Sequence, residues 1–435
     1  MRIYPVSLGC PKNQSVLEER LQLLLNMGHE VVLDPGLADV AVVNTCTFVE
    51  PATVESIETV ISLKQEYPHL KIFFTGCVTQ KYGKQVIKRE LEEVDFIADP
   101  DNIEDWLTVF DSFHRGDIID KDVFNDIPFT LTFPYAYVYV SKGCSSACSY
   151  CTIPSFKGPQ ISIPIDEIVR KVKMLENAGY KEVILVSQDV AAYGIDVGGF
   201  MLPNLLSDLH KHTREILFRL LYLNPKYFRK QIIEEIAHFE RLVPYFDIPI
   251  QHIHSDVLKL MNRGYTYENI VEILDTLYRY WKQPAVRTTL MIGFPGETDV
   301  HFQFLKDHIV ELPFDWIGVF KFLPEVGTPA YNMEQIPDEI KEERYNEMLR
   351  VVADYVEKRA YRWVGKDTQA IITEVISYDS GDVMSVGYPI FCAPEIDKVV
   401  HVINGDISDI GNVINVLIED YSNDIYGARF SQSQC

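Results

Sequence analysis

Three cysteines lie within eight residues in the segment Cys144-Ser-Ser-Ala-Cys148-Ser-Tyr-Cys151. This segment directly follows a buried strand predicted over residues 136–141. Thiolates are soft ligands that suit both iron–sulfur clusters and zinc. Three ligands on a four-iron cluster leave one iron open, whereas a structural zinc ion usually takes four ligands. Because no other Cys or His lies close by in the sequence, the spacing favours a cluster.

Three further cysteines, Cys10, Cys46 and Cys77, each follow the end of a predicted strand, with spacings of 36 and 31 residues. The strands are expected over residues 2–8, 40–44 and 71–75, and helical stretches over 17–27 and 54–65. One βαβ unit has a similar length of about 30 residues. Because parallel strands end at one edge of a sheet, the three thiols are expected to converge on one ligand. Three separately buried cysteines are the alternative.

Three polar residues, one within the segment 144–151 and two later in the chain, could bind a cofactor. An open iron can chelate the amino and carboxylate groups of S-adenosylmethionine, and the ring of Tyr150 would then face the nucleoside. Gln188 follows the predicted strand 182–187 and suits a ribose or a carboxylate, although its segment could also be only a helix N-cap. Arg287 begins a strand that ends in the turn Gly293–Glu297, where backbone can approach a ligand. We predict these three side chains as cofactor contacts and no catalytic residue beyond the clusters.

Other candidate ligands are expected to have packing roles. His252 and His254 alternate after a predicted strand, which favours packing over metal binding. Cys392 and Cys435 are isolated in the sequence and are expected to bind no metal.

The pattern of strands and helices predicts an α/β protein of three domains. Residues 1–130 alternate strands and helices, as in a parallel sheet with helical crossovers. Residues 131–362 repeat this alternation, which predicts a full or partial βα barrel, or an open sheet. Residues 363–435 have short apolar runs between turn residues, which predicts a small antiparallel β-barrel. The linker is expected over 116–134. The strands of the central domain are expected over 136–141, 182–187, 217–222, 245–250, 287–292 and 316–321.

The composition is that of a globular protein, with 47% apolar and 24% charged residues among 435. No apolar run suits a signal peptide or a membrane helix, so a cytoplasmic location is expected. Structural disulfides are not expected there, which favours metal binding by clustered cysteines. The net charge of −23 argues against broad electrostatic binding of nucleic acid.

Together these motifs resemble the radical S-adenosylmethionine methylthiotransferases, and the resemblance covers nearly the whole chain. Members of that family have an N-terminal domain with three cluster cysteines, a radical barrel with a C-x3-C-x2-C motif and a C-terminal TRAM β-barrel. Within the family, the chain is most similar to the enzymes that modify a ribosomal protein. The segments that carry this likeness are Ser7–Asn13, Ser187–Gly194, Asp247–His252, Gly293–Thr298 and Ala393–Asp397.

The resemblance implies two [4Fe-4S] clusters and S-adenosylmethionine as cofactors. One cluster would be held by Cys10, Cys46 and Cys77, and the cluster that binds S-adenosylmethionine by Cys144, Cys148 and Cys151. The implied reaction adds a methylthio group to the β-carbon of an aspartate in a small-subunit ribosomal protein. A reducing donor such as a flavodoxin or ferredoxin is expected, with no membrane partner and no direct tRNA substrate.

Charge supports a protein substrate. Residues 362–435 contain four Lys/Arg and eleven Asp/Glu, a balance of −7. An acidic domain suits a basic ribosomal protein better than it suits tRNA. Two alternatives stay open: a tRNA adenosine methylthiotransferase of the same architecture, and a non-catalytic iron–sulfur binding or sensor protein.

Two residues of the C-terminal region depart from the family pattern. An Arg is usual where this chain has Tyr388, and Asp is common at the position of Cys392. These departures are expected to alter details of substrate contact and to leave the cluster chemistry unchanged.

Overall fold

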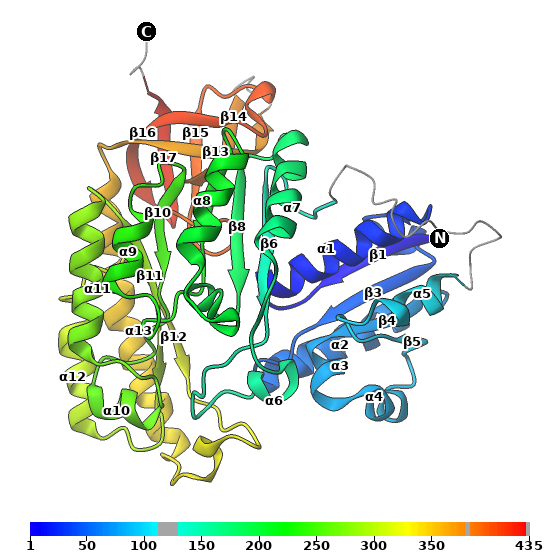
Figure 1. Ribbon diagram of the computed structural model, residues 1–435, viewed down its shortest axis with the longest axis horizontal. Helices are drawn as coiled ribbons and strands as arrows, with labels where there is room; N and C mark the ends of the chain where they lie inside the picture. Colours follow the sequence, from blue (N-terminus) through cyan, green and yellow to red (C-terminus); the bar gives the residue numbers. More distant parts are fainter. Residues whose placement is uncertain (112–128, 379–382, 432–435) are drawn as a thin grey trace. The chain divides into compact units, whose positions relative to one another are not determined.

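The computed structural model describes residues 1–111, 129–378 and 383–431, and Figure 1 shows their helices and strands. The chain forms two compact units. The first unit comprises Met1–Leu131, Tyr137–Tyr139 and Thr152–Pro159, and the second comprises Thr132–Ala136, Val140–Cys151 and Gln160–Cys435. Residues 116–128 of the predicted linker 116–134 lie outside the described residues.

The first unit is built on a parallel sheet with the strand order β2-β1-β3-β4-β5. Its strands are β1 (Arg2–Ser7), β2 (Glu30–Val31), β3 (Val40–Thr45), β4 (Lys71–Gly76) and β5 (Phe96–Ile97). Every residue of β3 is buried, as expected for a central strand covered on both faces. The predicted parallel α/β architecture of this region is confirmed.

Helices cover this sheet. They are α1 (Pro11–Asn26), α2 (Glu50–Glu66), α3 (Cys77–Tyr82), α4 (Lys84–Glu90) and α5 (Ile103–Asp111), with a short 3-10 helix, η1 (Pro35–Leu37). Leu17, Leu21 and Leu24 of α1 are buried at the spacing of one helix face. They pack in one core with Phe73 of β4 and Trp106 of α5, whose ring centroids lie 4.6 Å apart.

The second unit contains a seven-stranded sheet with the order β12-β11-β10-β9-β8-β6-β7. Its strands are β6 (Tyr135–Lys142), β7 (Ile161–Ser162), β8 (Glu182–Ser187), β9 (Leu217–Leu220), β10 (Leu242–Asp247), β11 (Ala285–Ile292) and β12 (Trp316–Lys321). Among the described strands β12 and β7 are the two ends of this order, so the sheet is a partial and not a full barrel. The strand predicted over 245–250 begins and ends three residues earlier. Pro249 is a reason for the earlier end, because it has no N–H to donate to a neighbouring strand.

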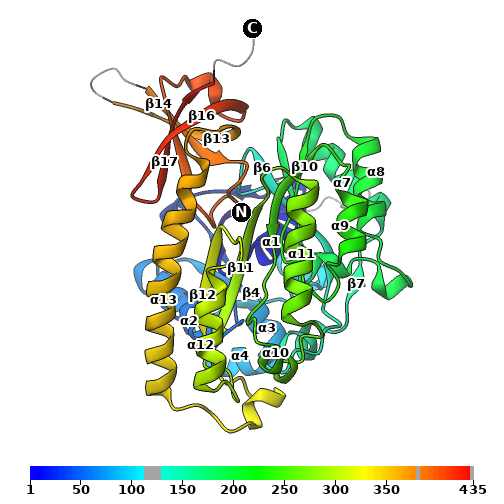
Figure 2. The same ribbon diagram turned by 90° about the vertical axis from the view of Figure 1, so that its left-hand side faces the viewer.

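The crossover helices lie along this sheet (Figure 2). The helices after β6 are α6 (Ile153–Lys157), α7 (Ile165–Asn177), α8 (Leu202–His212), α9 (Lys230–Ile236), α10 (Ser255–Leu260), α11 (Tyr267–Tyr280), α12 (Asp299–Ile309) and α13 (Asp338–Ala360). Short 3-10 helices are η2 (Val190–Ala192), η3 (Ile195–Val197), η4 (Pro329–Asn332), η5 (Tyr361–Trp363) and η6 (Ile407–Asp409). The long helix α13 packs against β11 and β12. Acidic residues in its first turn and basic residues in its last turn favour the helix dipole.

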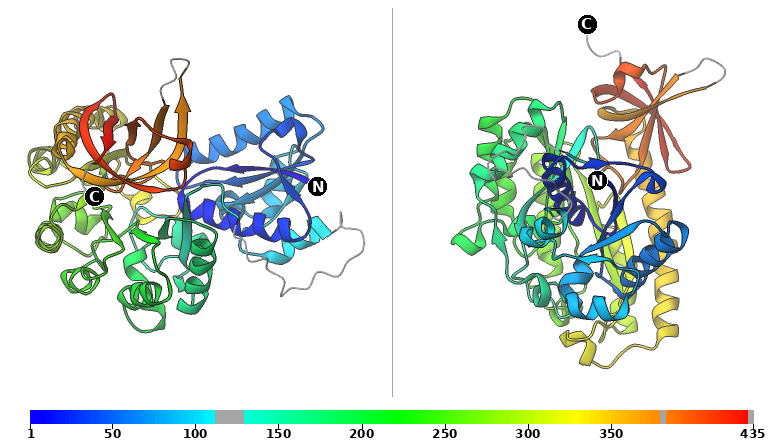
Figure 3. Two further views of the ribbon diagram at one scale, coloured as in Figure 1. Left: turned by 90° about the horizontal axis from the view of Figure 1, so that it is seen from above. Right: turned by 90° about the vertical axis from the view of Figure 1, so that its right-hand side faces the viewer.

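The C-terminal part of the second unit is a closed barrel with the order β13-β14-β15-β17-β16, orange and red in Figure 3. Its strands are β13 (Asp367–Ser377), β14 (Val383–Pro389), β15 (Val399–Ile403), β16 (Val413–Ser422) and β17 (Ile425–Phe430). The predicted small barrel is confirmed. It is not wholly antiparallel, because β15 and β17 run parallel.

A buried polar cluster joins this barrel to the seven-stranded sheet. Glu182 of β8 accepts hydrogen bonds from Arg219 of β9 at 2.8 Å and from the Tyr388 hydroxyl at 2.7 Å. Tyr388 and Cys392 are both buried, so the expected effect of these two residues on substrate contact is wrong for their side chains. This shared interior makes the sheet and the barrel one compact unit, and the division of the chain at 362 and 363 stays a prediction.

Candidate functional site

The three cysteines of the first unit lie at one edge of its sheet. Cys46 directly follows β3, Cys77 directly follows β4, and Cys10 comes three residues after the end of β1. These three strands are neighbours and run parallel, so their carboxyl ends lie side by side. The structure therefore brings together the edge positions that the sequence predicted.

Gly9 and Asn13 brace this edge. Gly9 has φ +99°, and a Cβ added there would lie 2.8 Å from the Cβ and 2.9 Å from the Sγ of Cys46. The Asn13 amide donates to the carbonyl oxygens of Leu8 at 3.2 Å and Thr45 at 2.7 Å. Its oxygen accepts from the Cys77 thiol at 3.4 Å. One side chain thus ties together the ends of three strands.

The protein surroundings favour the thiol over the thiolate at Cys46 and Cys77. Burial, with a smaller contribution from the neighbouring Cys10 and Cys46, raises the pKa of Cys77 to about 11 against the opposing effects of Lys157 and Lys12. Burial also raises the pKa of Cys46. Thiolates clustered here need a bound cation to stabilise them, and an iron–sulfur cluster supplies that charge. Three soft sulfur atoms at one sheet edge fit such a cluster.

The second set of cysteines lies in the loop after β6. The Cys144 sulfur accepts from the backbone N–H of Ser146 at 3.4 Å, and the backbone N–H of Cys151 donates to the Cys148 carbonyl at 3.2 Å. All three cysteines are partly exposed, and none of them forms a disulfide bond. Burial raises the pKa of Cys144, and nearby Asp189 raises it further. This loop also fits a three-thiolate cluster, with access for a further ligand.

Tyr150 lies inside this loop, against other side chains. Its ring lies edge-on to Phe294, with 6.2 Å between the centroids. Its hydroxyl accepts a hydrogen bond from Arg263 at 3.2 Å. The predicted contact between Tyr150 and a nucleoside stays a prediction.

Gln188 and Asp189 follow the carboxyl end of β8. Gln188 is half-buried, whereas Asp189 is buried, and its Oδ2 has no hydrogen-bond partner among the described residues. Burial raises the pKa of Asp189 to about 7, against the opposing effects of Asn224 and Arg263. The sequence singled out Gln188 as the cofactor contact within the polar segment Ser187-Gln188-Asp189, and did not select Asp189. Its position at the strand end was visible in the sequence, but its burial was not.

Arg287 forms an ion pair with a residue of the C-terminal region. It is the third residue of β11, and its guanidinium pairs with Asp397 of the C-terminal region. The Tyr245 hydroxyl donates to the same carboxylate at 2.6 Å. The structure therefore gives Arg287 an ion pair within the second unit, and its predicted contact with a cofactor stays a prediction.

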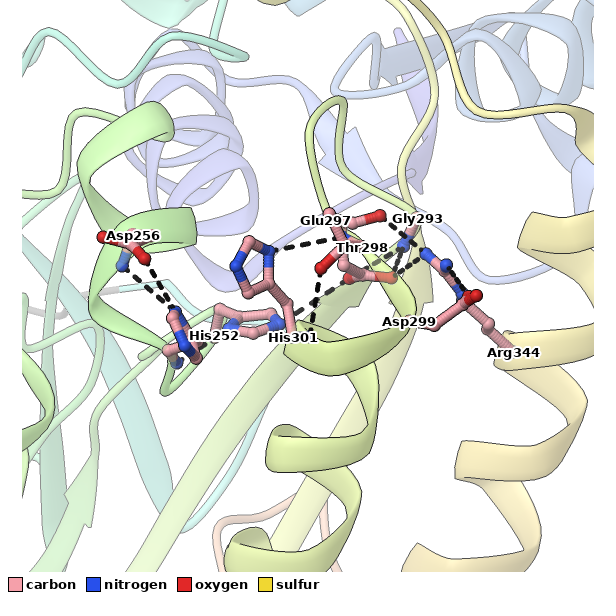
Figure 4. A network of polar contacts seen from close by, with 9 residues as sticks. His252, Asp256, Gly293, Glu297, Thr298, Asp299, His301 and Arg344 are labelled. Carbon is pink, nitrogen blue, oxygen red and sulfur yellow. Dashed lines mark hydrogen bonds and ion pairs between the residues drawn. The ribbon is translucent and has the colours of Figure 1, made fainter.

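The turn Gly293–Glu297 is held by its own acidic residue (Figure 4). The Glu297 carboxylate accepts from the Gly293 N–H at 3.2 Å and from Arg344 at 2.8 Å. The His252 Nε2 lies 3.6 Å from the same carboxylate. Burial raises the pKa of Glu297 to about 7, although Arg344 opposes this shift. Glu297 thus fixes the turn at the carboxyl end of β11.

The histidines near this turn serve as caps and packing groups. His252 is fully buried, and its Nδ1 accepts from the His254 N–H at 2.9 Å. His254, Asp256 and His301 bring ligand atoms within 4.8 Å of one another. However, the Nδ1 atoms of His254 and His301 accept backbone N–H groups of Asp256 and Thr298, both at 3.2 Å. These bonds give His252, His254 and His301 capping roles, and the preference for packing over metal binding at His252 and His254 stays a prediction.

Comparison with known protein families defines the class. Residues 138–309 match the Radical SAM superfamily, and residues 2–99 match the family described as Uncharacterized protein family UPF0004. The first match includes the loop of Cys144, Cys148 and Cys151. The chain is thus a radical SAM enzyme with a second, N-terminal cysteine site.

Curated relatives cover nearly the whole chain. "Ribosomal protein uS12 methylthiotransferase RimO" of Thermoanaerobacter sp. (strain X514) is 36% identical over 97% of this chain and 98% of the relative. The protein of the same name from Thermotoga maritima is 35% identical over 98% of this chain and 100% of the relative. The chain belongs to the RimO family of radical SAM methylthiotransferases. This confirms the resemblance seen in the sequence, and the family's cofactors are S-adenosylmethionine and [4Fe-4S] clusters.

A solved structure supports the fold. The radical S-adenosylmethionine methyltransferase TsrM from Kitasatospora setae is similar with a TM-score of 0.53 and 13% identity, over 76% of each chain. At this identity the likeness concerns the fold alone. Among the described residues, no helix is long and apolar enough to cross a membrane.

Proposed function

We propose that the protein transfers a methylthio group to the β-carbon of an aspartate in ribosomal protein uS12. The observation that carries this proposal is the presence of two sets of three cysteines, one in each unit. The chain that holds them aligns with a RimO relative over 97% of its length. One set of three cysteines alone would suffice for radical formation, so a second set indicates a second chemical task. Sulfur donation is the task that fits a methylthio product.

The cysteines divide between two cofactors. Cys144, Cys148 and Cys151 would hold the cluster that binds S-adenosylmethionine, and Cys10, Cys46 and Cys77 would hold the auxiliary cluster. When bound, these groups supply a carbon-centred radical that abstracts hydrogen and a sulfur source for the resulting substrate radical. The chain itself binds, orients and excludes water.

Specific side chains have defined tasks in this arrangement. The unpartnered Oδ2 of Asp189 offers an acceptor to a cationic group such as the amino group of S-adenosylmethionine. Gln188, at the same strand end, offers amide groups to a ribose or carboxylate. Tyr150 and Phe294 form an apolar wall beside the cysteine loop, which excludes water from a reactive radical.

The acidic C-terminal barrel supports a basic protein substrate over tRNA. A negative field speeds association with a basic partner and is screened by salt over about 10 Å at 0.1 M. Asp406 and Asp409 are poor places to test this, because they hold the turn around η6 through hydrogen bonds to Ser408 and Ser385. Glu419 is better, because it is exposed and, within the described residues, its ion pair is with Arg429 at 2.6 Å.

Charge reversal at Glu419 therefore tests the role of the barrel. We expect Glu419→Lys to slow association with uS12 by roughly threefold, with a smaller change in the dissociation rate. Glu90→Lys is the matched control, because Glu90 is also exposed and paired with an arginine, at 2.7 Å, in the first unit. Association rates from stopped-flow fluorescence decide the matter. Equal effects of both variants would remove the C-terminal barrel from substrate binding.

Two further partners belong to the proposal. A reducing electron donor such as a flavodoxin or ferredoxin would supply electrons, and the protein would work in the cytoplasm without a direct tRNA substrate. Mass spectrometry of uS12 and of tRNA after separate incubation with the reconstituted enzyme tests the substrate. A methylthio group on an aspartate of uS12 is the expected result, and methylthio-adenosine in tRNA beside unmodified uS12 would overturn it.

A further inference from the structure

The guanidinium of Arg263 is buried beside the second set of cysteines. Arg263 is only 6% exposed. Its Nη1 donates to the Cys148 sulfur at 3.3 Å and to the Tyr150 hydroxyl at 3.2 Å. Its Nε donates to the Tyr265 hydroxyl at 2.7 Å, and its Nη2 donates to the Pro249 carbonyl at 2.7 Å. Each of its three nitrogen atoms therefore has a defined partner.

None of these partners is a carboxylate. Within the described residues, Arg263 makes no ion pair with Asp or Glu inside 4 Å, although it lies close enough to lower the pKa of Asp189. A buried guanidinium without a counter-charge costs several kcal/mol, and arginine cannot lose its proton to avoid that cost. The sulfur of Cys148 is the one contacting group that becomes negative when it binds metal. The arrangement is therefore matched to a charged sulfur.

The position of Arg263 is fixed by two chain segments. The Ser149 N–H donates to the Met261 carbonyl at 3.0 Å, and the Ser149 hydroxyl donates to the Leu260 carbonyl at 2.8 Å. The Asn262 amide donates to the Ala147 carbonyl at 2.6 Å. These bonds join the end of α10 to the cysteine loop on both sides of Cys148. The distance between the guanidinium and the sulfur is thus set by the backbone of both segments.

We propose that Arg263 raises the reduction potential of the cluster held by Cys144, Cys148 and Cys151, through a charged hydrogen bond to the Cys148 sulfur. This inference rests on the proposed function, because it takes these three cysteines as cluster ligands. One electron from a flavodoxin- or ferredoxin-class donor makes the cluster one charge more negative, and no covalent bond forms or breaks. A fixed positive donor stabilises that added charge. Arg263 thereby makes reduction of the cluster by its electron donor more favourable.

The test measures the reduction potential of this cluster alone. In a background of Cys10→Ala, Cys46→Ala and Cys77→Ala, the variants Arg263→Gln and Arg263→Lys are reconstituted without oxygen and titrated by electron paramagnetic resonance, with no substrate present. For Arg263→Gln, the ratio of reduced to oxidised cluster at a fixed potential should fall about tenfold, which is 59 mV for one electron. Arg263→Lys keeps the charge but lacks the planar fork, so a smaller shift in the same direction is expected.

Arg229→Gln is the matched control. Arg229 donates to the Gly264 carbonyl at 3.2 Å and to the Lys226 carbonyl at 3.0 Å, next to Arg263 in space, but to no sulfur. Its removal should leave the potential unchanged. A shift in this control as large as that of Arg263→Gln would overturn the proposal, because any nearby positive charge would then suffice.

Iron analysis completes the test. A fully loaded Arg263→Gln protein at the wild-type potential would overturn the proposal. If Arg263→Gln loses its iron, Arg263→Lys decides: a lower potential supports the proposal, and the wild-type potential overturns it. Loss of iron from both variants also overturns it, because Arg263 would then hold the cluster instead of setting its potential. Failure of the parent protein to bind iron at these cysteines would instead contradict the proposed function.

Discussion

The two cysteine sets differ in how the chain assembles them. In the first unit the cysteines come from three separate strand ends and meet only when β1, β3 and β4 pair. In the second unit they come from a single loop after β6, so their proximity is already given by eight residues of sequence. The first site thus depends on the whole sheet, and the second depends mainly on the segments that hold one loop. A folding defect should therefore damage the first site more.

The two sets also differ in the polar group that contacts a sulfur. In the first set a neutral amide, Asn13, accepts from the Cys77 thiol. In the second set a charged guanidinium, Arg263, donates to the Cys148 sulfur. A charged donor stabilises an electron added to a cluster, and a neutral acceptor does not. The Asn13 contact is one to the protonated thiol, whereas Arg263 can also donate to a sulfur that has become a thiolate.

The largest expected effect comes from removing the second set. Cys144→Ala, Cys148→Ala and Cys151→Ala together should remove about four of about eight irons and abolish formation of 5′-deoxyadenosine, because no open iron remains for S-adenosylmethionine. Iron analysis and chromatography of the nucleoside measure both effects. Cys392→Ala, at a buried cysteine distant in sequence from both sets, should keep all iron. Stoichiometric zinc without iron in the wild-type protein would contradict the cluster assignment.

A smaller effect is expected from a glycine substitution that displaces a cysteine of the first site. Gly9→Ala places a Cβ 2.8 Å from that of Cys46 at φ +99°, whereas Gly83→Ala meets nothing within 4 Å at φ +81°. Both changes put a Cβ on a residue with positive φ, which costs about 1–3 kcal/mol of backbone strain, and Gly9→Ala adds about 1–3 kcal/mol of overpacking.

Urea unfolding and iron analysis in the background without the second set check this comparison. Gly9→Ala should lower both stability and iron content, and Gly83→Ala should lower stability less and keep the iron. Equal iron contents in the two variants would show that the first site tolerates displacement of Cys46.

The last expected effect is a pH dependence of stability at the second site. In the cofactor-free protein the pKa of Asp189 is raised by burial to about 7, from an ordinary value of 3.8. Between these values the folded state binds more protons than the unfolded state, so this group makes stability fall as pH rises from about 4 to 7. The slope is at most about 1.4 kcal/mol per pH unit.

Asp189→Asn should remove that contribution. The free energy of unfolding of the variant should gain on the wild-type value as pH rises from 4 to 7, as measured by urea titration at several pH values. Asp196→Asn is the control with the opposite sign, because hydrogen bonds from Ser162 outweigh desolvation and lower the pKa of Asp196. A difference between Asp189→Asn and wild type that does not vary with pH would rule out the raised pKa.

The sequence predicted the parts of this molecule that depend on local pattern. Strands 182–187 and 316–321 were predicted with the bounds that the structure shows. Each is a short run rich in apolar and β-branched residues that stands between segments of clear helical pattern. The convergence of Cys10, Cys46 and Cys77 followed from the topology of parallel strands. The closed C-terminal barrel followed from short strands between turns.

Other features depend on contacts between distant residues and could not be predicted. Arg263 lies 115 residues after Cys148, and no local pattern signals that contact. The burial of Asp189 and the pairing of Arg287 with Asp397 depend in the same way on tertiary packing. Tyr388 was expected to alter details of substrate contact, but its hydroxyl completes a buried cluster with Glu182.

The most direct test of the account is one reaction with the variant Cys10→Ala, Cys46→Ala and Cys77→Ala. The protein, S-adenosylmethionine, a reductant and uS12 are incubated without oxygen, and 5′-deoxyadenosine and methylthio-modified uS12 are measured in the same sample. The account predicts that the nucleoside still forms while the modified protein is absent, because the second site is intact and the sulfur source is gone. Modified uS12, or loss of the nucleoside from a protein that keeps the iron of its second site, would contradict the division of labour between the two cysteine sets.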